Sequence, residues 1–388
     1  MMIRGFKDMD NMSKKRKICF VSGSYPKYKI GGAELQSYYL AREFVKIGWE
    51  VHFTCTDLGN KNREFIIDEG IRVHKFNYKR LFDVLSFFKI YNVLKKINAD
   101  IYYFRGTYFT GITGLYAKIH KKIFILAISS DVNCNNHIFI KSVRKSNMNL
   151  FRKIILYLDA KIKDIVYFYG LNNADLVFVQ TKYQKNLIKR NFHIESYVLK
   201  NGHPIHFRLP PKANPPTVLW VGSLKRLRQA EVFIRLAKKC EDLDCRFILA
   251  GRPSDERYRD EVLKQLEGLS NVKYIGGLTL EESNEKIGRA SILVNTSKYE
   301  GFPNTFVQAW MREVPTVSLN VDPDNIIKDF QLGFHSKTFD QLVKEIRLLI
   351  TDKNLRIKIG QNARKYAIEE HDINKIHEKF LIILNELH

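Results

Sequence analysis

The sequence predicts two doubly wound α/β domains joined by a proline-rich linker. Short apolar strands alternate with amphipathic helices along both halves of the 388-residue chain, as in parallel sheets that are covered on both faces. Five of the ten prolines fall within residues 204–216. Because proline is disfavoured in helix interiors and central strands, we assign these residues to the linker.

The first domain is expected over residues 14–203, after an unstructured extension at 1–13. Its first elements are a buried strand at Ile18–Ser22 and an amphipathic helix at Glu34–Ile47, which stops at Gly48. Further strands are expected at 51–55, 71–76, 100–104, 123–128, 175–179 and 196–199. Helices are expected at 81–97, 110–119 and 182–191, with an irregular and helical stretch at 131–173.

The same alternation restarts after the linker, over a second domain at 217–370. Strands are expected at 217–221, 246–250, 272–275, 291–295 and 315–319. Helices are expected at 228–239, 256–267, 280–288, 304–312, 337–350, 353–370 and 373–386. Residues 371–388 form a C-terminal helix that is free to pack back on the first domain.

Composition restricts the class of protein. The five cysteines include no C-x-x-C pair, which fits a reducing cytosol and gives no zinc site. The longest apolar run, Ile123–Ile128, is far shorter than the roughly 18 residues that a spanning helix needs. No apolar core of a signal peptide stands at the N-terminus. We therefore expect a cytoplasmic protein.

The net charge of +23 is concentrated in the first half. Residues 1–200 hold 35 basic and 16 acidic residues, against 29 and 25 in residues 201–388. Such a field attracts a nucleic acid, an acidic membrane or a phosphorylated substrate, unless it is simply a solvated basic surface. Residues 141–163 are basic and aliphatic, which suits either an anionic membrane surface or a buried crossover helix with an exposed basic face.

Two glycine-containing turns lie where a strand passes into a helix. Gly31-Gly32 follows the first strand, and Gly222-Ser223-Leu224-Lys225 leads to Arg228 after the first strand of the second domain. Both turns suit the phosphates of a ligand. The alternatives are a plain tight turn and a solvated basic helix start. Neither a dinucleotide fingerprint nor a P-loop occurs.

The most specific segment is Ser297–Trp310. A strand ends, a loop carries Glu300-Gly301-Phe302, and a helix opens at Pro303-Asn304. Proline suits the first helical turn, and the N–H groups of the next three residues are expected to face a ligand. Glu300 and Gln308 flank this opening and can bond hydroxyl groups.

These features, in this order, resemble glycosyltransferase family 4 over about residues 16–388. The resemblance implies a GT-B fold, in which two Rossmann-like domains face each other across a cleft. It also implies a retaining transfer of sugar from a nucleotide-sugar, without a metal and with no cofactor beyond that substrate. The donor is expected to be a UDP- or GDP-sugar, and the acceptor a glycan or a lipid-linked glycan.

The resemblance also implies a role for particular residues. Arg228 neutralises phosphate charge, Glu300 contacts the donor sugar, and Asp131 is the first-domain residue expected to position that sugar. These three are the expected catalytic residues. The remaining donor-binding positions are Gly31, Gly32, Gly222, Ser223, Lys225, Ile275, Gly276, Leu278, Gly301, Phe302, Pro303, Asn304, Thr305 and Gln308.

Three positions depart from the family pattern. Gln308 replaces its second acid, Ser223 replaces a common arginine, and Ser130 stands where a histidine is often found. A noncatalytic nucleotide-sugar-binding protein is therefore one alternative function. A basic nucleic-acid-binding protein is another, although no stacking platform or known module supports it.

Weaker signals suggest other sites. Asp242 and Asp244 match a D-x-D metal motif, but they are expected in a solvated turn. Asp322 and Asp324 suit a surface turn equally well, and the hinge residues His203 and His206 suit packing better than metal binding. We expect no metal site, and a cytoplasmic enzyme that can associate with the inner face of the cell membrane.

Overall fold

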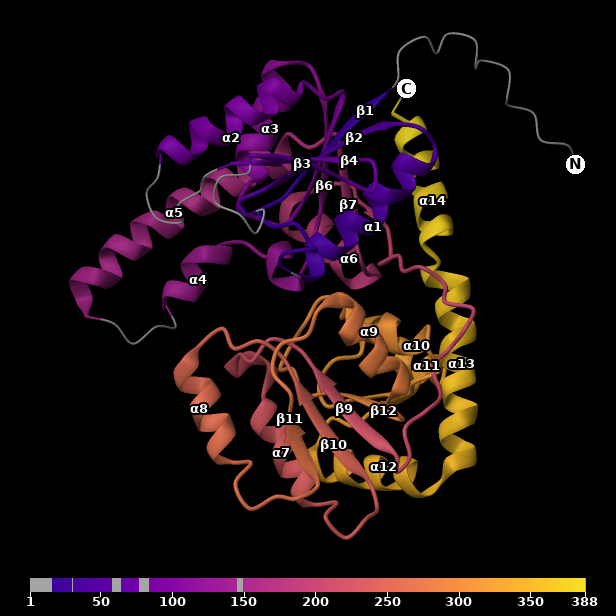
Figure 1. Ribbon diagram of the computed structural model, residues 1–388. Helices are drawn as coiled ribbons and strands as arrows, with labels where there is room; N and C mark the ends of the chain where they lie inside the picture. The colour runs from indigo at the N-terminus through magenta and orange to yellow at the C-terminus, as the bar shows by residue number, and fades with distance from the viewer. Residues whose placement is uncertain (1–15, 30, 58–63, 77–83, 145–148, 388) are drawn as a thin grey trace, which may run out of the picture.

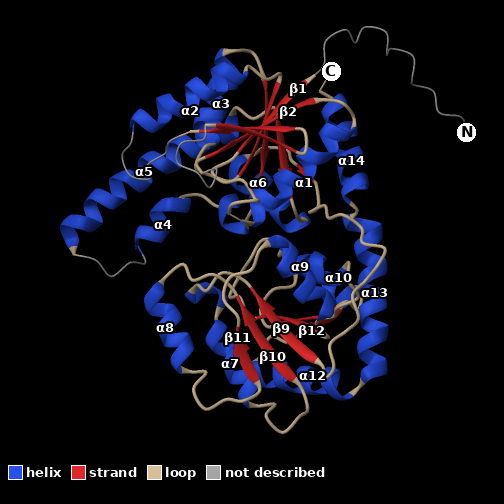
Figure 2. Ribbon diagram, in the orientation of Figure 1, coloured by secondary structure: helices blue, strands red, loops and turns tan. Residues whose placement is uncertain are grey.

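The structure is a computed structural model that describes residues 16–29, 31–57, 64–76, 84–144 and 149–387. It shows two α/β domains stacked one above the other, each with helices on both faces of a sheet (Figures 1 and 2). The expected extension at 1–13 and the start of the helix expected at 81–97 lie outside the described residues. No helix in the described ranges is long and apolar enough to cross a membrane.

The first domain contains an eight-stranded sheet in the order β3-β4-β2-β1-β5-β6-β7-β8. Its strands are β1 Lys17–Val21, β2 Glu50–Cys55, β3 Phe65–Asp68, β4 Ile71–Lys75, β5 Ile101–Arg105, β6 Ile123–Ala127, β7 Leu176–Val179 and β8 Tyr197–Val198. All pairs are parallel except β3–β4. The sequence analysis missed β3, because this short edge strand is largely exposed and gives a weak apolar signal.

The helices of the first domain cover both faces of that sheet (Figure 2). They are α1 Gly32–Lys46, α2 Val84–Ile97, α3 Thr110–Ile119, α4 Ile138–Arg144, α5 Leu150–Asn172 and α6 Lys182–Phe192, with a 3-10 turn η2 at Asp131–Cys134. On α1, Leu40 and Phe44 are buried against Phe20 and Phe53 of the sheet. Burying such side chains supplies the main force that holds helix to sheet.

The second domain contains a six-stranded, wholly parallel sheet in the order β11-β10-β9-β12-β13-β14. Its strands are β9 Thr217–Val221, β10 Arg246–Ala250, β11 Val272–Tyr274, β12 Ile292–Asn295, β13 Thr316–Ser318 and β14 Gly333–His335. The sequence analysis missed β14, which is only three residues long and shows no measurable periodicity.

The helices of the second domain are α7 Ala230–Lys238, α8 Glu256–Lys264, α9 Leu280–Arg289, α10 Asn304–Trp310, α11 Ile326–Asp329, α12 Phe339–Thr351 and α13 Lys353–His371, with 3-10 turns η3 Arg226–Arg228 and η4 Pro323–Asn325. The helix expected at 228–239 therefore begins later than expected. Gln229 has a left-handed φ of 50°, so the helix cannot continue back through Arg228.

The chain crosses between the domains twice, and the two crossings lie side by side. The N–H of His203 donates to the His371 carbonyl at 2.8 Å, and the N–H of Ile373 donates to the His203 carbonyl at 3.1 Å. After this point α14, Ile373–Asn385, returns to the first domain (Figure 1). Its Phe380 and Ile383 are buried in the same core as Phe20, so the last helix ties the C-terminal end of the chain to the first domain.

Candidate functional site

The candidate site lies where the carboxyl ends of the two sheets face each other. In the second sheet the chain order reverses at β9, which pairs with both β10 and β12; in the first it reverses at β1. Ligands of doubly wound sheets bind outside the carboxyl ends at such a reversal. The connections after β9 and β12 carry Arg228, at the end of η3, and Glu300, while the loop after β1 ends at Gly31 and Gly32 opens α1.

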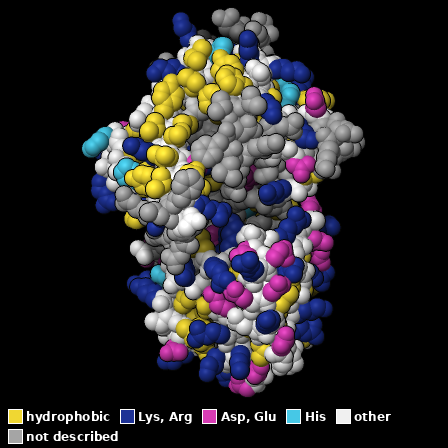
Figure 3. Space-filling view, turned by 90° about the vertical axis from the view of Figure 1, so that its left-hand side faces the viewer, with side chains coloured by type: hydrophobic (Ala, Val, Ile, Leu, Met, Phe, Trp, Pro, Cys, Tyr) yellow, Lys and Arg dark blue, Asp and Glu magenta, His cyan; other side chains and the backbone are white. Residues whose placement is uncertain are grey.

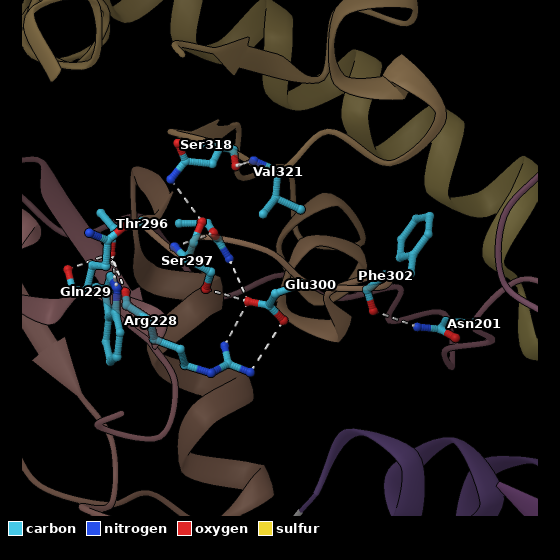
Figure 4. Close-up of polar contacts among 12 residues, drawn as sticks. Asn201, Arg228, Gln229, Thr296, Ser297, Glu300, Phe302, Ser318 and Val321 are labelled. Atoms are coloured by element: carbon cyan, nitrogen blue, oxygen red, sulfur yellow. Dashed lines mark hydrogen bonds and ion pairs between the residues drawn. The ribbon is translucent and has the colours of Figure 1, made fainter. Parts of the chain in front are cut away.

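The Glu300 carboxylate is the centre of this site (Figure 4). Its Oε1 accepts hydrogen bonds from Arg228 Nη1 at 3.0 Å, Asn295 Nδ2 at 3.1 Å and Ser297 Oγ at 2.6 Å. Its Oε2 accepts from Arg228 Nη2 at 3.4 Å. The side chains of Arg228 and Glu300 are 27% and 14% exposed, so both charges are held in place yet reach the surface.

The backbone under Arg228 is fixed by a threonine. Thr296 Oγ1 lies 2.7 Å from the carbonyl oxygen of Arg228 and 2.9 Å from that of Gln229, and it accepts from Trp220 Nε1 at 2.9 Å. A Cβ at Gly222 would lie 3.1 Å from Arg228 Cδ and Nη1. The absence of a side chain at Gly222 therefore lets the Arg228 side chain pack directly against the backbone of this loop.

The start of α10 differs in detail from the expectation. Pro303 precedes the helix as its N-cap residue, and Phe306 N–H donates to the Pro303 carbonyl at 3.1 Å. The expectation that Phe306 N–H faces a ligand is therefore wrong. In the described part of the chain, the N–H groups of Asn304 and Thr305 have no acceptor, as expected of an uncapped helix start.

The Asn304 side chain joins the two domains. Its Nδ2 donates to the Gly32 carbonyl at 2.8 Å, and its Oδ1 accepts from Gln36 Nε2 and Asn201 Nδ2, both at 2.9 Å. Asn201 Nδ2 also donates to the Phe302 carbonyl at 3.1 Å (Figure 4). The structure thus brings the predicted Gly32, Phe302 and Asn304 together, with Asn304 contacting the first domain through its side chain.

Gly301 approaches the first domain just before Asp131. A Cβ at Gly301 would lie 3.1 Å from the Ser129 carbonyl oxygen and from Ser130 Cα, so only glycine fits without a shift. Asp131 Oδ1 accepts from Gln184 Nε2 at 2.8 Å. Burial raises the pKa of Asp131, and the Asp324 carboxylate raises it further, against the lowering effect of the Gln184 hydrogen bond.

Gln308 is more deeply buried than we expect of a side chain that contacts a ribose. It is 4% exposed, and its Nε2 donates to Asn284 Oδ1 of α9 at 3.1 Å. Its Oε1 makes no hydrogen bond within the described residues, so this atom could accept from a ligand hydroxyl.

The other predicted donor-binding residues line the neighbouring strand ends. Ser223 is half-buried and Lys225 is exposed just before η3. Beyond β11, Ile275 and Leu278 are half-buried, and the Gly276 carbonyl accepts the Gly251 N–H at 2.7 Å. The hydrogen bond ties together the loops that follow β10 and β11.

Comparison with known sequences identifies the family. Residues 30–206 match the family described as Glycosyltransferase Family 4, and residues 203–366 match Glycosyl transferases group 1. The chain is a family 4 glycosyltransferase. Together the two matches extend over both domains, so the resemblance seen in the sequence is confirmed.

Two curated relatives of this glycosyltransferase are only distantly similar to it. A poly(ribitol-phosphate) alpha-N-acetylglucosaminyltransferase of Staphylococcus aureus is 23% identical over 55% of this chain and 44% of its own length. An uncharacterized glycosyltransferase of Methanocaldococcus jannaschii is 25% identical over 55% of this chain and 60% of its own length. The chain therefore spans only about half the length of these relatives.

Solved structures confirm the GT-B fold. The sucrose-phosphate synthase of Thermosynechococcus elongatus has a TM-score of 0.75 at 16% identity, covering 96% of this chain and 99% of that one. Anabaena HepE, solved in complex with UDP and glucose, has a TM-score of 0.68 at 15% identity, covering 96% of this chain and all of that one. At such identities the likeness establishes the fold alone.

Three of the four aspartates considered for metal binding have protein partners in this glycosyltransferase. Asp242 pairs with Arg347 at 2.5 Å, Asp322 accepts the N–H of Ile327 at 2.8 Å, and Asp324 accepts the N–H of Lys182 at 2.7 Å. No group of three or more His, Cys, Asp or Glu side chains is placed to hold a metal within the ranges described above.

Several residues that shape the site were missed by the sequence analysis. Asn295 and Ser297 hold Glu300, while Gln36, Asn201 and Gln184 contact the segments around it. A polar residue at the end of the buried strand β12 was a usable signal for Asn295. Gln36 gave a weaker one, a polar side chain on the buried face of α1.

Proposed function

We propose that this glycosyltransferase moves a sugar from a nucleotide-sugar to an acceptor hydroxyl with retention of anomeric configuration. The observation that carries the proposal is the Arg228–Glu300 pair at the β9–β12 reversal, close to an uncapped helix start. A guanidinium suits a diphosphate, and a carboxylate suits sugar hydroxyls. The diphosphate and the sugar of the donor would thus be held by two adjacent side chains of opposite charge.

In the proposed reaction a bond forms between the acceptor oxygen and the anomeric carbon as the bond from that carbon to the diphosphate breaks. The bonding electrons leave with the diphosphate, whose oxygen takes the acceptor proton. Arg228 and the N–H groups of Asn304 and Thr305 would stabilise the growing negative charge. Glu300 would orient the sugar, Asp131 would approach it from the first domain, and no metal is required.

We propose UDP as the nucleotide, because two proteins of this fold, HepE and a mutant of Staphylococcus aureus TarM, were solved in complex with UDP. The loop at Ile275, Gly276 and Leu278 would contact the base, and Gln308 Oε1 would accept from a ribose hydroxyl. Thermal-shift measurements with UDP, GDP, ADP and dTDP test this proposal. A ligand at a hundredfold excess over its Kd stabilises the fold by about 2.7 kcal/mol, so one nucleotide should stand out.

For the acceptor we propose a glycan carried on a lipid, as in the assembly of a surface polysaccharide. The strongly basic first half supports this, since it attracts an anionic membrane. The enzyme would then work at the inner face of the cell membrane. Transfer assays on lipid-linked acceptors, with the product anomer read by NMR, test both acceptor and stereochemistry. Tight nucleotide binding without turnover on any donor would instead favour a noncatalytic sensor.

A further inference from the structure

Helix α5 of the first domain carries an exposed apolar stripe. Ile154, Leu158, Ile162, Ile165 and Tyr169 follow one another at spacings that keep them on one face of a helix. With Ile155 and Val166 beside them, their exposed fractions run from 37% to 59%. In a soluble monomer, so long a row of exposed apolar side chains requires an explanation.

The same surface is rich in cations. Arg152 and Lys161 are exposed at the borders of the stripe, and Lys118 stacks over the Tyr169 ring at 5.9 Å. At the C-terminal end of α5, Lys118, Lys121 and Lys122 line a depression with Asn172, Asn173 and a single acid, Asp175. Figure 3 shows this side of the molecule: hydrophobic side chains gather on the first domain, whereas the second domain displays mixed charges.

The acids of α5 do not oppose this charge at the surface. Asp159 is paired with Lys163, and Asp164 is buried, where it accepts the N–H groups of Phe139 and Ile140. Within the described residues, the exposed face of α5 therefore presents apolar groups flanked by cations. That combination is typical of helices that lie in the interface of an anionic bilayer.

We infer that the α5 stripe is the surface through which this glycosyltransferase docks on an anionic membrane. The inference rests on the proposed function, because a membrane-borne acceptor gives the docking its purpose. It also adds to the electrostatic attraction a specific apolar contact. The α4–α5 pair follows directly from η2, which begins at Asp131, and it projects from the left-hand side of the first domain (Figure 1).

The placement has a consequence for the acceptor. The segment that approaches Gly301, Ser129–Asp131, leads through η2 and α4 into the docking helix. A lipid-linked glycan held in the bilayer beside α5 would then have a short route along the first domain to the donor sugar. Docking and acceptor entry would occur on one side of the molecule.

The test is flotation of the full-length protein with vesicles of phosphatidylcholine, alone or mixed with phosphatidylglycerol. The variant is Ile162→Glu, and the matched control is Ile382→Glu on α14, since these isoleucines are 57% and 56% exposed. We expect binding only to anionic vesicles and weaker binding as salt screens the charges. Ile162→Glu should bind at least tenfold more weakly, and Ile382→Glu should bind as the parent does.

Folding and activity are checked separately. Both variants should keep the parent melting temperature and the parent rate of nucleotide-sugar turnover with a soluble acceptor. Equal binding of parent and Ile162→Glu to anionic vesicles would overturn the role of the stripe, and binding to no vesicle would overturn the inference as a whole. A dimer by light scattering that Ile162→Glu dissociates would instead make the stripe an interface between copies. If the parent protein turns over nucleotide-sugar but binds no vesicle, only the docking surface is refuted. If the parent protein binds no nucleotide, the proposed function itself is refuted.

Discussion

Replacing Glu300 by alanine is expected to slow transfer while tightening the binding of free nucleotide. In the structure Glu300 neutralises Arg228 through contacts of 3.0 and 3.4 Å. A diphosphate would have to take Arg228 from this carboxylate, so removal of the carboxylate favours the nucleotide. The donor sugar, however, would lose the group that we propose to orient it.

The two effects can be sized from the same contacts. The side chains of Arg228 and Glu300 are 27% and 14% exposed, so the pair is covered more than a surface pair, which contributes about 0–1 kcal/mol. We therefore take the upper end of that range, about 1 kcal/mol, which corresponds to about fivefold tighter UDP binding. Hydrogen bonds to a charged group are worth about 1.5–3 kcal/mol, so kcat should fall by about ten- to a hundredfold. Opposite signs for affinity and turnover make the prediction specific.

The assay combines calorimetry of free nucleotide with steady-state kinetics on the cognate donor. Glu300→Gln is the conservative variant, because it keeps the volume and the hydrogen-bonding capacity but not the charge. Gln308→Ala is the contrasting variant: its proposed contact is to the ribose, which does not react. Loss of this contact should mainly raise the donor KM, by the equivalent of about 0.5–1.5 kcal/mol of binding free energy. UDP binding should weaken by the same amount.

One outcome would refute this reasoning. If Glu300→Ala loses UDP binding and keeps kcat, the carboxylate binds the nucleotide rather than the sugar, and the proposed placement of the donor is reversed.

Three further outcomes are expected. Asn304→Ala should lower the melting temperature and raise donor KM, because Gln36 and Asn201 each lose a hydrogen-bond acceptor. A buried donor without an acceptor costs about 1–3 kcal/mol. An unchanged melting temperature and KM would refute the role of Asn304 in joining the domains. EDTA should leave transfer intact. Complete loss of transfer that Mn²⁺ restores would instead favour a metal site at Asp242 and Asp244 or at Asp322 and Asp324. Unfolding free energy should fall as the pH drops below about 6.5, by up to about 1.4 kcal/mol per pH unit per histidine, because burial lowers the pKa of His203 to about 3 and of His371 to about 4. The unfolded chain then binds more protons than the folded chain, and denaturant titrations at several pH values, with His203→Gln as the comparison, would show no such slope if these imidazoles were solvated.

The alternation of apolar strands and amphipathic helices was enough to predict both parallel sheets. Buried strands such as β1 and β12 each contain an uninterrupted apolar run, and helices such as α1 and α12 repeat their buried residues at helical spacing. Elements that depend on a neighbour gave no such signal. The exposed edge strand β3 forms by pairing with β4, and the three-residue β14 forms by pairing with β13.

Local sequence motifs likewise predicted the residues that the second domain contributes to the site better than they predicted the contacts between the two domains. Glu300, Pro303 and Asn304 lie in one contiguous segment, so their common loop was readable from the sequence. Asn304 meets Gly32 and Gln36 across about 270 positions, and no local pattern encodes a contact at that separation. Family resemblance assigned Asn304 to the donor, whereas packing shows that its side chain contacts the first domain.

The domain contact and the charged pair are parts of one arrangement. Asn304 opens α10, whose N–H groups lie at the end of the segment that begins with Glu300. Its side chain is bonded to Gly32 and Asn201, so the position of the first domain fixes where that helix start points. Donor binding would separate Arg228 from Glu300 beside this fixed point, and each charge would acquire a new partner: Arg228 the diphosphate, Glu300 the sugar. Arg228 would exchange one anion for another, whereas Glu300 would exchange a cation for neutral hydroxyls and keep its hydrogen bonds from Asn295 and Ser297. The carboxylate would therefore stay hydrogen-bonded when its charged partner leaves, which limits the cost of the exchange.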